Sequence, residues 1–376
     1  MHERSDVPRV CLVSELTGGV GVYSQNLIRG LVDLGVDVIV VTPTPDLSPA
    51  KRTIAVRRHF GRGRWLPQAW SFARGLRQAG ERYDLVHFTD ARFAIFAPNR
   101  STPIVGTMND YFYAITGWFS GVGSRRIYED WLLRHVYYNL TRTLERGCLS
   151  RLDGVVCISG AVADVLHARY RITRSNLHVV PYGIDYGRTD LEPVPCSGPM
   201  ILFAGGNFQR KGLHVLIEAS GKILNAFPAA RFVVLGQSAD RGLMEQRCEE
   251  AGVRRAFDFV GQVDYETLYR YYVAASVFTM PSLLEAFGIP YLEAMHCGVP
   301  VVASDAAGPD EYLRDQRNCL IAPAGNAAAL ADATIKLLGD RQLVKRLIEC
   351  GKETARAFTL RQMAATTLGV YRSVVA

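Results

Sequence analysis

The segment of residues 278–313 constrains the fold more strongly than any other part of the chain. It begins with an apolar run and a Pro-Ser turn, continues through Glu285, an Ala-Phe-Gly sequence and Glu293, and then reaches a β-branched run. Pro290 is typical of the first turn of a helix, because the N–H group that proline lacks has no partner there. Gly298 is typical of the residue after a helix ends. The pattern predicts a strand, a glycine-bearing loop, a helix with Glu293 in its first turn, and a second strand.

The start of this helix is an expected anion site, because the first backbone N–H groups of a helix have no partner within it. Glu285 lies in the loop just before them. We expect the amides to bind a phosphate group and the two glutamates to accept hydrogen bonds from sugar hydroxyls. An ordinary strand–loop–helix unit with a capping glutamate is the alternative. The residues expected to supply the amides are Ala286, Phe287, Gly288 and Ile289.

The order E-x7-E with Phe-Gly inside it, continued as EAM-x-x-G-x-P-V-V-A-S, resembles the donor-site motif of retaining GT-B glycosyltransferases, in particular the large family 4. The resemblance implies an α/β fold of two Rossmann-like, doubly wound domains that face a cleft. It implies transfer of a hexose-type sugar from a UDP or GDP sugar to a hydroxyl acceptor, in glycan, polysaccharide or glycolipid biosynthesis. Retention at the anomeric carbon, and no metal or other cofactor, are also implied. Glu285 would orient the donor sugar, and Glu293 would bind the ribose.

A second loop has the composition of a phosphate site. Residues 205–212 follow an apolar run, precede a helical pattern and resemble the family's G-x5-K-G loop. Arg210 and Lys211 at the start of a helix would add full charges to the helix dipole, directed at a diphosphate. Two solvated cations are the alternative. The resemblance also implies that Gln262 and Val263, in a turn after a later strand, face the nucleotide base.

The beginning of the chain repeats the arrangement of strand, glycine loop and helix. Residues 10–14 are apolar, and the following glycines, which have no Cβ, would let a ligand approach the backbone. The segment resembles the GGVG-x-Y segment of family 4, where it faces the donor. The spacing is not GxGxxG, and no acidic residue stands where a nicotinamide ribose needs one, so a dehydrogenase is disfavoured. The expected donor-binding glycines are Gly18, Gly19 and Gly21.

Three residues of the first half are catalytic candidates. His87 closes a run that resembles the family's D-V-V-H strand, although a histidine at a strand end is as often a hydrogen-bonded structural residue. Asn109 and Asp110 close a run that resembles P-V-V-x-T-x-H-D, with asparagine in place of the usual histidine. Asparagine keeps a hydrogen bond but exchanges no proton near neutral pH. Either this position only orients a substrate, or Asp110 or His87 substitutes, or the chain is a weak or inactive relative.

Length and composition predict two soluble domains. A chain of 376 residues is long for one core. The expected bounds are residues 1–190 for an acceptor-binding domain, completed by a returning helix at 355–376, and residues 191–354 for a donor-binding domain. No apolar run approaches the roughly 20 residues that span a bilayer, and the N-terminus lacks the apolar region of a secretory signal. We expect a cytoplasmic protein whose eight cysteines are reduced core thiols rather than metal ligands.

The positive charge lies in the first half of the chain. Residues 1–190 contain 24 Lys or Arg against 17 Asp or Glu, and residues 191–376 contain 19 of each. A basic half suggests a polyanionic partner, for which an anionic membrane surface or a lipid-linked or glycan acceptor ranks above nucleic acid. The segment of residues 111–146 mixes arginines with aromatic residues, which suggests an acceptor flap or a peripheral membrane contact. A solvated basic surface is the alternative for both. Two interpretations are open for Arg57, Arg58, Arg62, Arg64 and Trp65: a basic and aromatic lip, or a solvated loop, and the solvated loop is the favoured one.

Overall fold

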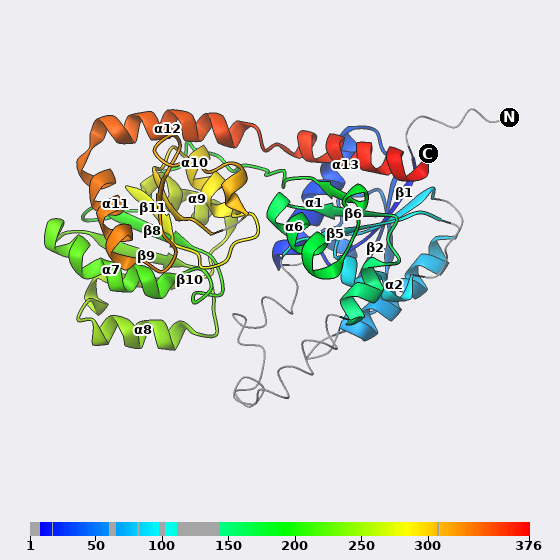
Figure 1. Ribbon diagram of the computed structural model, residues 1–376, viewed down its shortest axis with the longest axis horizontal. Coiled ribbons are helices and arrows are strands. Elements are labelled where there is room, and N and C mark those ends of the chain that lie inside the picture. The colour runs from blue at the N-terminus through cyan, green and yellow to red at the C-terminus, as the bar shows by residue number, and fades with distance from the viewer. Residues whose placement is uncertain are drawn as a thin grey trace. The chain divides into compact units, whose positions relative to one another are not determined.

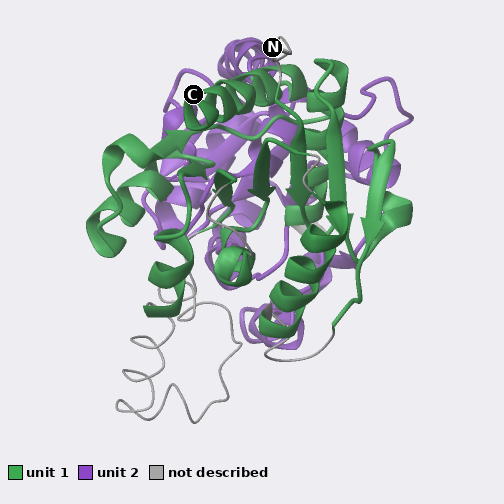
Figure 2. Ribbon diagram, turned by 90° about the vertical axis from the view of Figure 1, so that its right-hand side faces the viewer, with its two compact units in different colours: residues 1–116, 123–185, 358–376 green, residues 117–122, 186–357 purple. Residues whose placement is uncertain are grey.

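The computed structural model describes residues 8–16, 18–59, 65–80, 83–97, 102–110, 143–306 and 308–376. These residues form two compact units, drawn in different colours in Figure 2. The first unit contains the described residues up to Asp185 and those from Phe358 onward, and the second runs from Tyr186 to Ala357. The expected lip residues Arg62 and Arg64, and nearly all of the aromatic segment at 111–146, lie outside the described residues.

The first unit is built on a parallel sheet with seven described strands, in the order β3-β2-β1-β4-β5-β6-β7. The central strands are buried along their whole length, because helices cover both faces of such a sheet, whereas the edge strands β3 and β7 are partly exposed. The strands are β1 (Val10–Val13), β2 (Val38–Thr42), β3 (Arg52–Ala55), β4 (Leu85–Phe88), β5 (Ile104–Met108), β6 (Gly154–Cys157) and β7 (Leu177–Val179).

The chain's last helix belongs to the first unit, where it packs against α1 and β6 (Figure 1). Gly30 permits this contact, because a Cβ at that position would lie 2.8 Å from both the Leu360 carbonyl oxygen and the Ala364 Cβ. The described helices of this unit are α1 (Gly18–Asp33), α2 (Trp65–Ala79), α6 (Gly160–Tyr170), α13 (Leu360–Val375) and the short 3-10 helices η1 (Pro45–Leu47), η2 (Ala91–Phe96) and η3 (Arg174–Asn176).

The second unit has a parallel sheet of six described strands in the order β10-β9-β8-β11-β12-β13. Strand order reverses beside β8, since the chain first builds outward to β10 and then returns to place β11 on the other side of β8. In doubly wound sheets, ligands bind at the carboxyl ends of the strands at such a reversal. The strands are β8 (Met200–Ala204), β9 (Arg231–Leu235), β10 (Phe257–Gly261), β11 (Val277–Met280), β12 (Val301–Ser304) and β13 (Leu320–Ala322).

The segment that contains Glu285 and Glu293 forms β11, a loop, α10 and β12, so the prediction of strand, loop, helix and strand is confirmed. Pro290 lies in the first turn of α10, and Gly298 follows its end at a φ of +74°. The described helices of the unit are α7 (Leu213–Ala226), α8 (Arg241–Glu250), α9 (Tyr265–Ala274), α10 (Ile289–His296), α11 (Ala327–Gly339), α12 (Arg341–Arg356), η4 (Arg254–Ala256) and η5 (Pro309–Glu311).

Two further features bear on the expectations from composition. None of the helices in the described ranges is both long enough and apolar enough to cross a membrane. All eight cysteines are free thiols. Cys11 and Cys157 are fully buried, and burial raises the pKa of each to about 12, so both stay protonated at neutral pH.

Candidate active site

The loops that follow β8 and β11 lie side by side at the strand-order reversal of the second unit. The Leu283 N–H donates a 2.8 Å hydrogen bond to the Arg210 carbonyl oxygen and so ties the two loops together. Gly212 lies directly before α7 at a φ of +74°, and a Cβ there would lie 1.8 Å from the Pro281 carbonyl oxygen. Only glycine fits this position, so Gly212 is what allows the two loops to meet.

Lys211 and Glu285 form a buried ion pair across these loops. Their side chains are only 11% and 7% exposed, so the alternative of a solvated cation is wrong for Lys211. Burial raises the pKa of Glu285, but the charge and hydrogen bond of Lys211 and the charge of Arg210 outweigh burial and lower it overall. Glu285 is therefore a carboxylate at neutral pH, and it also accepts a 3.4 Å hydrogen bond from Ser282 Oγ.

The predicted anion site at the start of α10 is packed from behind. Gly288 stands before the helix at a φ of +87°, where a side chain would collide with the ring of Tyr291. Tyr312 donates its hydroxyl to the carbonyl oxygens of Phe287 and Gly288, at 2.7 and 2.8 Å. Ala286 and Phe287 are buried beside Glu285. The loop is thus held rigidly, with the amino end of α10 directly after it.

Glu293 lies one turn further along α10 than expected. The helix begins at Ile289, after the glycine with positive φ, so Glu293 is in the second turn and the prediction of the first turn is wrong. Its side chain is buried and accepts a 3.0 Å hydrogen bond at Oε2 from the Tyr272 hydroxyl of α9. Burial raises the pKa of Glu293 to about 7, against the opposing effect of the Tyr272 hydrogen bond. The two glutamates of one motif therefore differ in charge state near neutral pH.

Gln262 and Val263 are not brought next to this pair. They follow β10, which is separated from β8 by β9 in the sheet order. Gln262 is exposed and Val263 half-buried. The turn is anchored to the loop after β9, because the Gly236 N–H donates a 2.8 Å hydrogen bond to the Gly261 carbonyl oxygen.

The glycines at the start of the chain occupy helix rather than loop. Gly18, Gly19 and Gly21 lie in the first turns of α1, so the prediction of a glycine loop before the helix is wrong. A Cβ at Gly21 would lie 2.4 Å from the Leu16 carbonyl carbon. This glycine is therefore needed for the tight connection between β1 and α1, whatever else binds there.

His87 is enclosed in the first unit with both ring nitrogens hydrogen-bonded. Nδ1 lies 2.6 Å from the Tyr371 hydroxyl of α13, and Nε2 lies 2.7 Å from Thr107 Oγ1 of β5. Tyr23 of α1 extends this chain with a 3.0 Å contact to the same Thr107 hydroxyl. Burial lowers the pKa of His87 to about 3, so the ring is neutral. This placement favours the structural alternative, in which His87 fastens the last helix to the sheet.

Asn109 follows β5 and is held by two hydrogen bonds. Its amide group donates to the Thr89 carbonyl oxygen, and its Oδ1 accepts a 2.9 Å hydrogen bond from the Tyr182 hydroxyl. The ring of Tyr182 in turn packs 4.9 Å from that of Tyr23. Asp110 is half-buried next to Asn109. The asparagine is oriented by its neighbours, which fits a positional role better than proton transfer.

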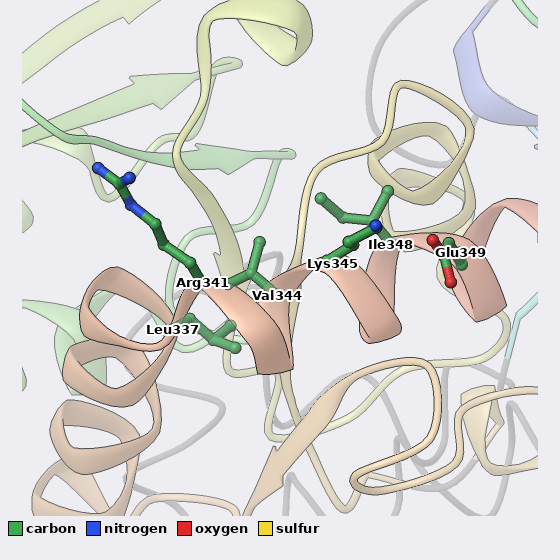
Figure 3. Close-up of a pocket in the computed structure, with 6 residues that line it drawn as sticks. All are labelled: Leu337, Arg341, Val344, Lys345, Ile348 and Glu349. Atoms are coloured by element: carbon green, nitrogen blue, oxygen red, sulfur yellow. The ribbon is translucent and has the colours of Figure 1, made fainter.

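A surface hollow lies elsewhere in the second unit, along α11 and α12 (Figure 3). None of the residues predicted from the sequence lines it, and it has no part in the site. In the part of the chain that the structure describes, no group of three or more His, Cys, Asp or Glu side chains is arranged to hold a metal ion. The residues that line the hollow are Leu337, Arg341, Val344, Lys345, Ile348 and Glu349.

Sequence reasoning missed Tyr272 and Tyr312. Tyr272 lies on α9, which precedes β11, and only the sheet order brings its hydroxyl to Glu293. Tyr312 follows η5 and closes the loop before α10. Each is a tyrosine in an otherwise ordinary segment, and no local pattern marks it.

Known glycosyltransferase families match both halves of the chain. The family described as "Glycosyl transferases group 1" matches residues 193–354, and "Glycosyltransferase Family 4" matches residues 17–188. The chain is 32% identical over 201 residues to the phosphatidyl-myo-inositol mannosyltransferase of Mycobacterium leprae. That match covers 52% of this chain and only about half, 53%, of the relative.

Solved structures share the fold over nearly the whole chain. The sucrose-phosphate synthase of Thermosynechococcus elongatus aligns with a TM-score of 0.77 at 22% identity, covering 97% of this chain and 98% of that one. HepE of Anabaena, in complex with UDP-glucose, aligns with a TM-score of 0.73 at 15% identity, covering 97% and 99%. The expected fold, two Rossmann-like parallel-sheet domains of the GT-B type, is confirmed.

Proposed function

Because this chain belongs to family 4 of the glycosyltransferases, we propose that it transfers a hexose-type sugar from a nucleoside-diphosphate sugar to a hydroxyl acceptor with retention at the anomeric carbon. The observation that carries the proposal is the buried Lys211–Glu285 pair at the carboxyl ends of β8 and β11. A cation and a carboxylate kept out of water at the strand-order reversal are suited to a ligand that has both phosphates and hydroxyls.

The diphosphate is the leaving group, and its charge grows as the reaction proceeds. Arg210 and Lys211, together with the amides of Ala286, Phe287, Gly288 and Ile289, would stabilise this charge. Lys211 is already held in place by Glu285, so little reorganisation is needed when the donor binds. Lys211, Arg210 and the helix amides together can offset the charge of a diphosphate, and we therefore propose chemistry without a metal or other cofactor.

Glu285 and Glu293 would recognise hydroxyl groups. Glu285 is ionised and paired with Lys211, which makes it a poor nucleophile but a good acceptor for a hydroxyl of the donor sugar. Glu293 would accept from the ribose hydroxyls through Oε1, because Tyr272 uses only Oε2. Gln262, Val263, Gly18, Gly19 and Gly21 remain proposed donor contacts from the family resemblance.

The bond changes require no protein nucleophile. The acceptor oxygen would form its bond to the anomeric carbon on the face from which the diphosphate departs. The electron pair of the broken carbon–oxygen bond leaves with the diphosphate, and a phosphate oxygen takes the acceptor's proton. Asn109, fixed by Tyr182 and Thr89, would orient a substrate without exchanging a proton. Asp110 beside it is the proposed second contact.

The donor is of the UDP or GDP type, and the complex of HepE with UDP-glucose supports UDP as the first to test. We propose a glycan or lipid-linked acceptor, a cytoplasmic location and a peripheral contact with an anionic membrane. The excess positive charge of residues 1–190 supports the membrane contact. Nucleic acid is not a proposed partner.

The test is thermal unfolding with UDP, GDP, ADP or NAD. A ligand at about one hundred times its dissociation constant stabilises the folded state by roughly 2.7 kcal/mol. We expect one nucleoside diphosphate to raise the melting temperature of the wild type but not of Arg210→Ala or Lys211→Ala. Lys222→Ala is the matched control, because Lys222 is half exposed and pairs with Asp332 on the surface. An equal shift in Arg210→Ala and Lys222→Ala would contradict the assigned site.

A catalytically weak donor-binding protein is the second candidate, and the asparagine at position 109 favours it. Turnover decides between the two. A protein that binds the diphosphate but releases no diphosphate from any sugar donor, with glycan or lipid acceptors present, would be such a relative. The configuration of the product, read from its anomeric proton coupling, distinguishes retention from inversion. Release of free sugar phosphate would point instead to another GT-B enzyme type.

A further inference from the structure

One stretch of the first unit gathers positive charge without any acid. Residues 47–80 contain eight Lys or Arg and no Asp or Glu, whereas the formal net charge of the whole chain is +7. The stretch includes β3, the segment after it and α2. Of its cations, Arg62 and Arg64 lie outside the described residues and are not used below.

The exposed cations of this stretch form no ion pairs among the residues that the structure describes. Lys51, Arg52, Arg57, Arg74 and Arg77 are exposed, and none forms an ion pair with an acid in the described part of the chain. Other surface arginines of the same unit do have partners, such as Arg9 with Asp84 and Arg29 with Asp185. Unpaired like charges on one surface repel each other, so such a cluster is suited to an external anion.

The outer row of α2 adds large apolar side chains to these charges. Leu66, Trp70 and Arg74 follow one another at four-residue spacing, which places them on one side of the helix. Leu66 is 38% and Trp70 51% exposed. The Arg74 guanidinium carbon lies 5.0 Å from the centre of the Trp70 ring, so the two groups share one site. The opposite side of α2, with Phe72 and Leu76, is buried against the unit.

The segment after β3 is fastened along the same helix. The His59 N–H donates a 3.0 Å hydrogen bond to Gln68 Oε1, and Gln68 Nε2 donates to the Arg57 carbonyl oxygen at 3.3 Å. His59 Nε2 lies 2.8 Å from Ser71 Oγ. These bonds hold the Arg57 backbone along the buried Gln68 and Ser71 side of α2, and the exposed Arg57 side chain adds positive charge to the same unit. The basic face of α2 itself consists of Leu66, Trp70, Arg74 and Arg77.

We propose that the basic face of α2 is a docking surface for an anionic lipid bilayer. Arginines attract the anionic headgroups, and a tryptophan and a leucine in the same row can enter the headgroup boundary. A sulfated or phosphorylated glycan would need the cations alone, and a single-stranded nucleic acid would use the cations and the indole. Neither uses the exposed aliphatic Leu66, whereas a headgroup boundary buries both side chains, which is why the face fits a membrane better. The inference deepens the proposed function, since it locates the membrane contact and rests on that function for its biological purpose.

The experiment is co-sedimentation of the full chain with phosphatidylcholine vesicles, with and without phosphatidylglycerol. We expect binding only to the anionic vesicles and weaker binding at high salt. Arg74→Gln/Arg77→Gln should lower the partition coefficient roughly 30-fold, because each cation near an anionic membrane contributes about fivefold. Trp70→Ser should lower it as well. The matched control is Arg241→Gln/Arg247→Gln, which removes the same charge from α8 in the second unit.

Each outcome decides the proposal. Equal binding to neutral and anionic vesicles, or equal losses in the α2 and α8 double variants, overturns it. If Trp70→Ser binds vesicles like the wild type, and a single-stranded oligonucleotide binds in an α2-dependent way, the face is a general polyanion site and the lipid assignment is wrong. The thermal shift with the nucleoside diphosphate must persist in every α2 variant, which shows that each is folded. If no nucleoside diphosphate shifts the melting temperature of the wild type, that result contradicts the proposed transferase activity. It does not affect the conclusion drawn from vesicle binding.

Discussion

Tyr272 of α9 donates a 3.0 Å hydrogen bond to Glu293 of α10, and both side chains are buried. Burial raises the pKa of Glu293 to about 7, whereas Lys211 and Arg210 overcome burial at Glu285 and lower its pKa. Glu285 is therefore charged at neutral pH. Glu293 changes its charge near neutral pH, which gives donor binding a pH dependence.

Donor affinity should rise with pH through about 7. A ribose hydroxyl donates to a carboxylate, so the donor prefers the ionised form of Glu293, which becomes dominant only above its pKa. We expect the dissociation constant of the matching nucleoside diphosphate to be about tenfold higher at pH 6 than at pH 8. At pH 6, one unit below the pKa, the protonated form of Glu293 outnumbers the ionised form about tenfold, and only the ionised form binds well. Calorimetric titration at several pH values measures it. The 2′-deoxy nucleotide should show a weaker dependence, and an equal dependence would contradict the role of Glu293.

Glu293→Gln should stabilise the protein while weakening donor binding. The pKa of Glu293 is higher in the folded protein than in the unfolded chain, so protonation of Glu293 favours folding. This contribution to the free energy of unfolding is complete at low pH and is lost as pH rises from about 4.5 to about 7. At pH 8 the buried charge therefore opposes folding, by up to roughly 3 kcal/mol. Urea unfolding at pH 8 and pH 4.5 measures the difference, which should be confined to the higher pH. Glu353 is exposed, and Glu353→Gln is the control, which should show no gain in stability at pH 8 over pH 4.5.

Tyr272→Phe tests the positioning of Glu293. The hydrogen bond from Tyr272 lowers the pKa of Glu293, so its removal should move the midpoint of the pH dependence above 7. At neutral pH we expect donor affinity to fall about tenfold, because a hydrogen bond to a charged group contributes about 1.5–3 kcal/mol. Raising the pH should restore part of the affinity, which a merely structural loss would not do. Tyr271→Phe, the neighbouring half-buried tyrosine, is the control.

The sequence predicted the framework of this site better than its details. Apolar runs, Pro290 and Gly298 are local signals, and they located β11, α10 and β12 correctly. The contact between Tyr272 and Glu293 depends on which strands are neighbours, and no local pattern contains that. The turn occupied by Glu293 depends on Gly288 at a φ of +87°, which delays the helix to Ile289. Glycine adopts positive and negative φ about equally well, so its presence at position 288 does not predict which one occurs.

His87 should act through folding rather than catalysis. Tyr371→Phe removes one of its two hydrogen bonds and leaves a buried ring nitrogen without that partner, at a cost of about 1–3 kcal/mol. We expect lower stability in urea with kcat unchanged. The pKa of His87 is depressed to about 3, so its contribution to folding is present above the unfolded value of 6.5 and is lost as pH falls from there toward 3. His87→Gln should therefore flatten acid unfolding in this range. A fall in kcat that tracks protonation near pH 7 would contradict the structural role.

The Lys211–Glu285 pair should show strong coupling in a double-mutant cycle. Lys211→Met leaves a buried carboxylate unpaired, which costs about 3–5 kcal/mol, and Glu285→Gln leaves a buried ammonium with similar consequences. Lys211→Met/Glu285→Gln removes both charges, so it should recover most of the stability while still failing to bind the nucleoside diphosphate. Urea unfolding and the thermal shift measure the two effects separately. The exposed pair Lys222–Asp332 is the control, whose cycle should show coupling below about 1 kcal/mol. If the double variant is no more stable than the single variants, the pair is not what holds these two loops together.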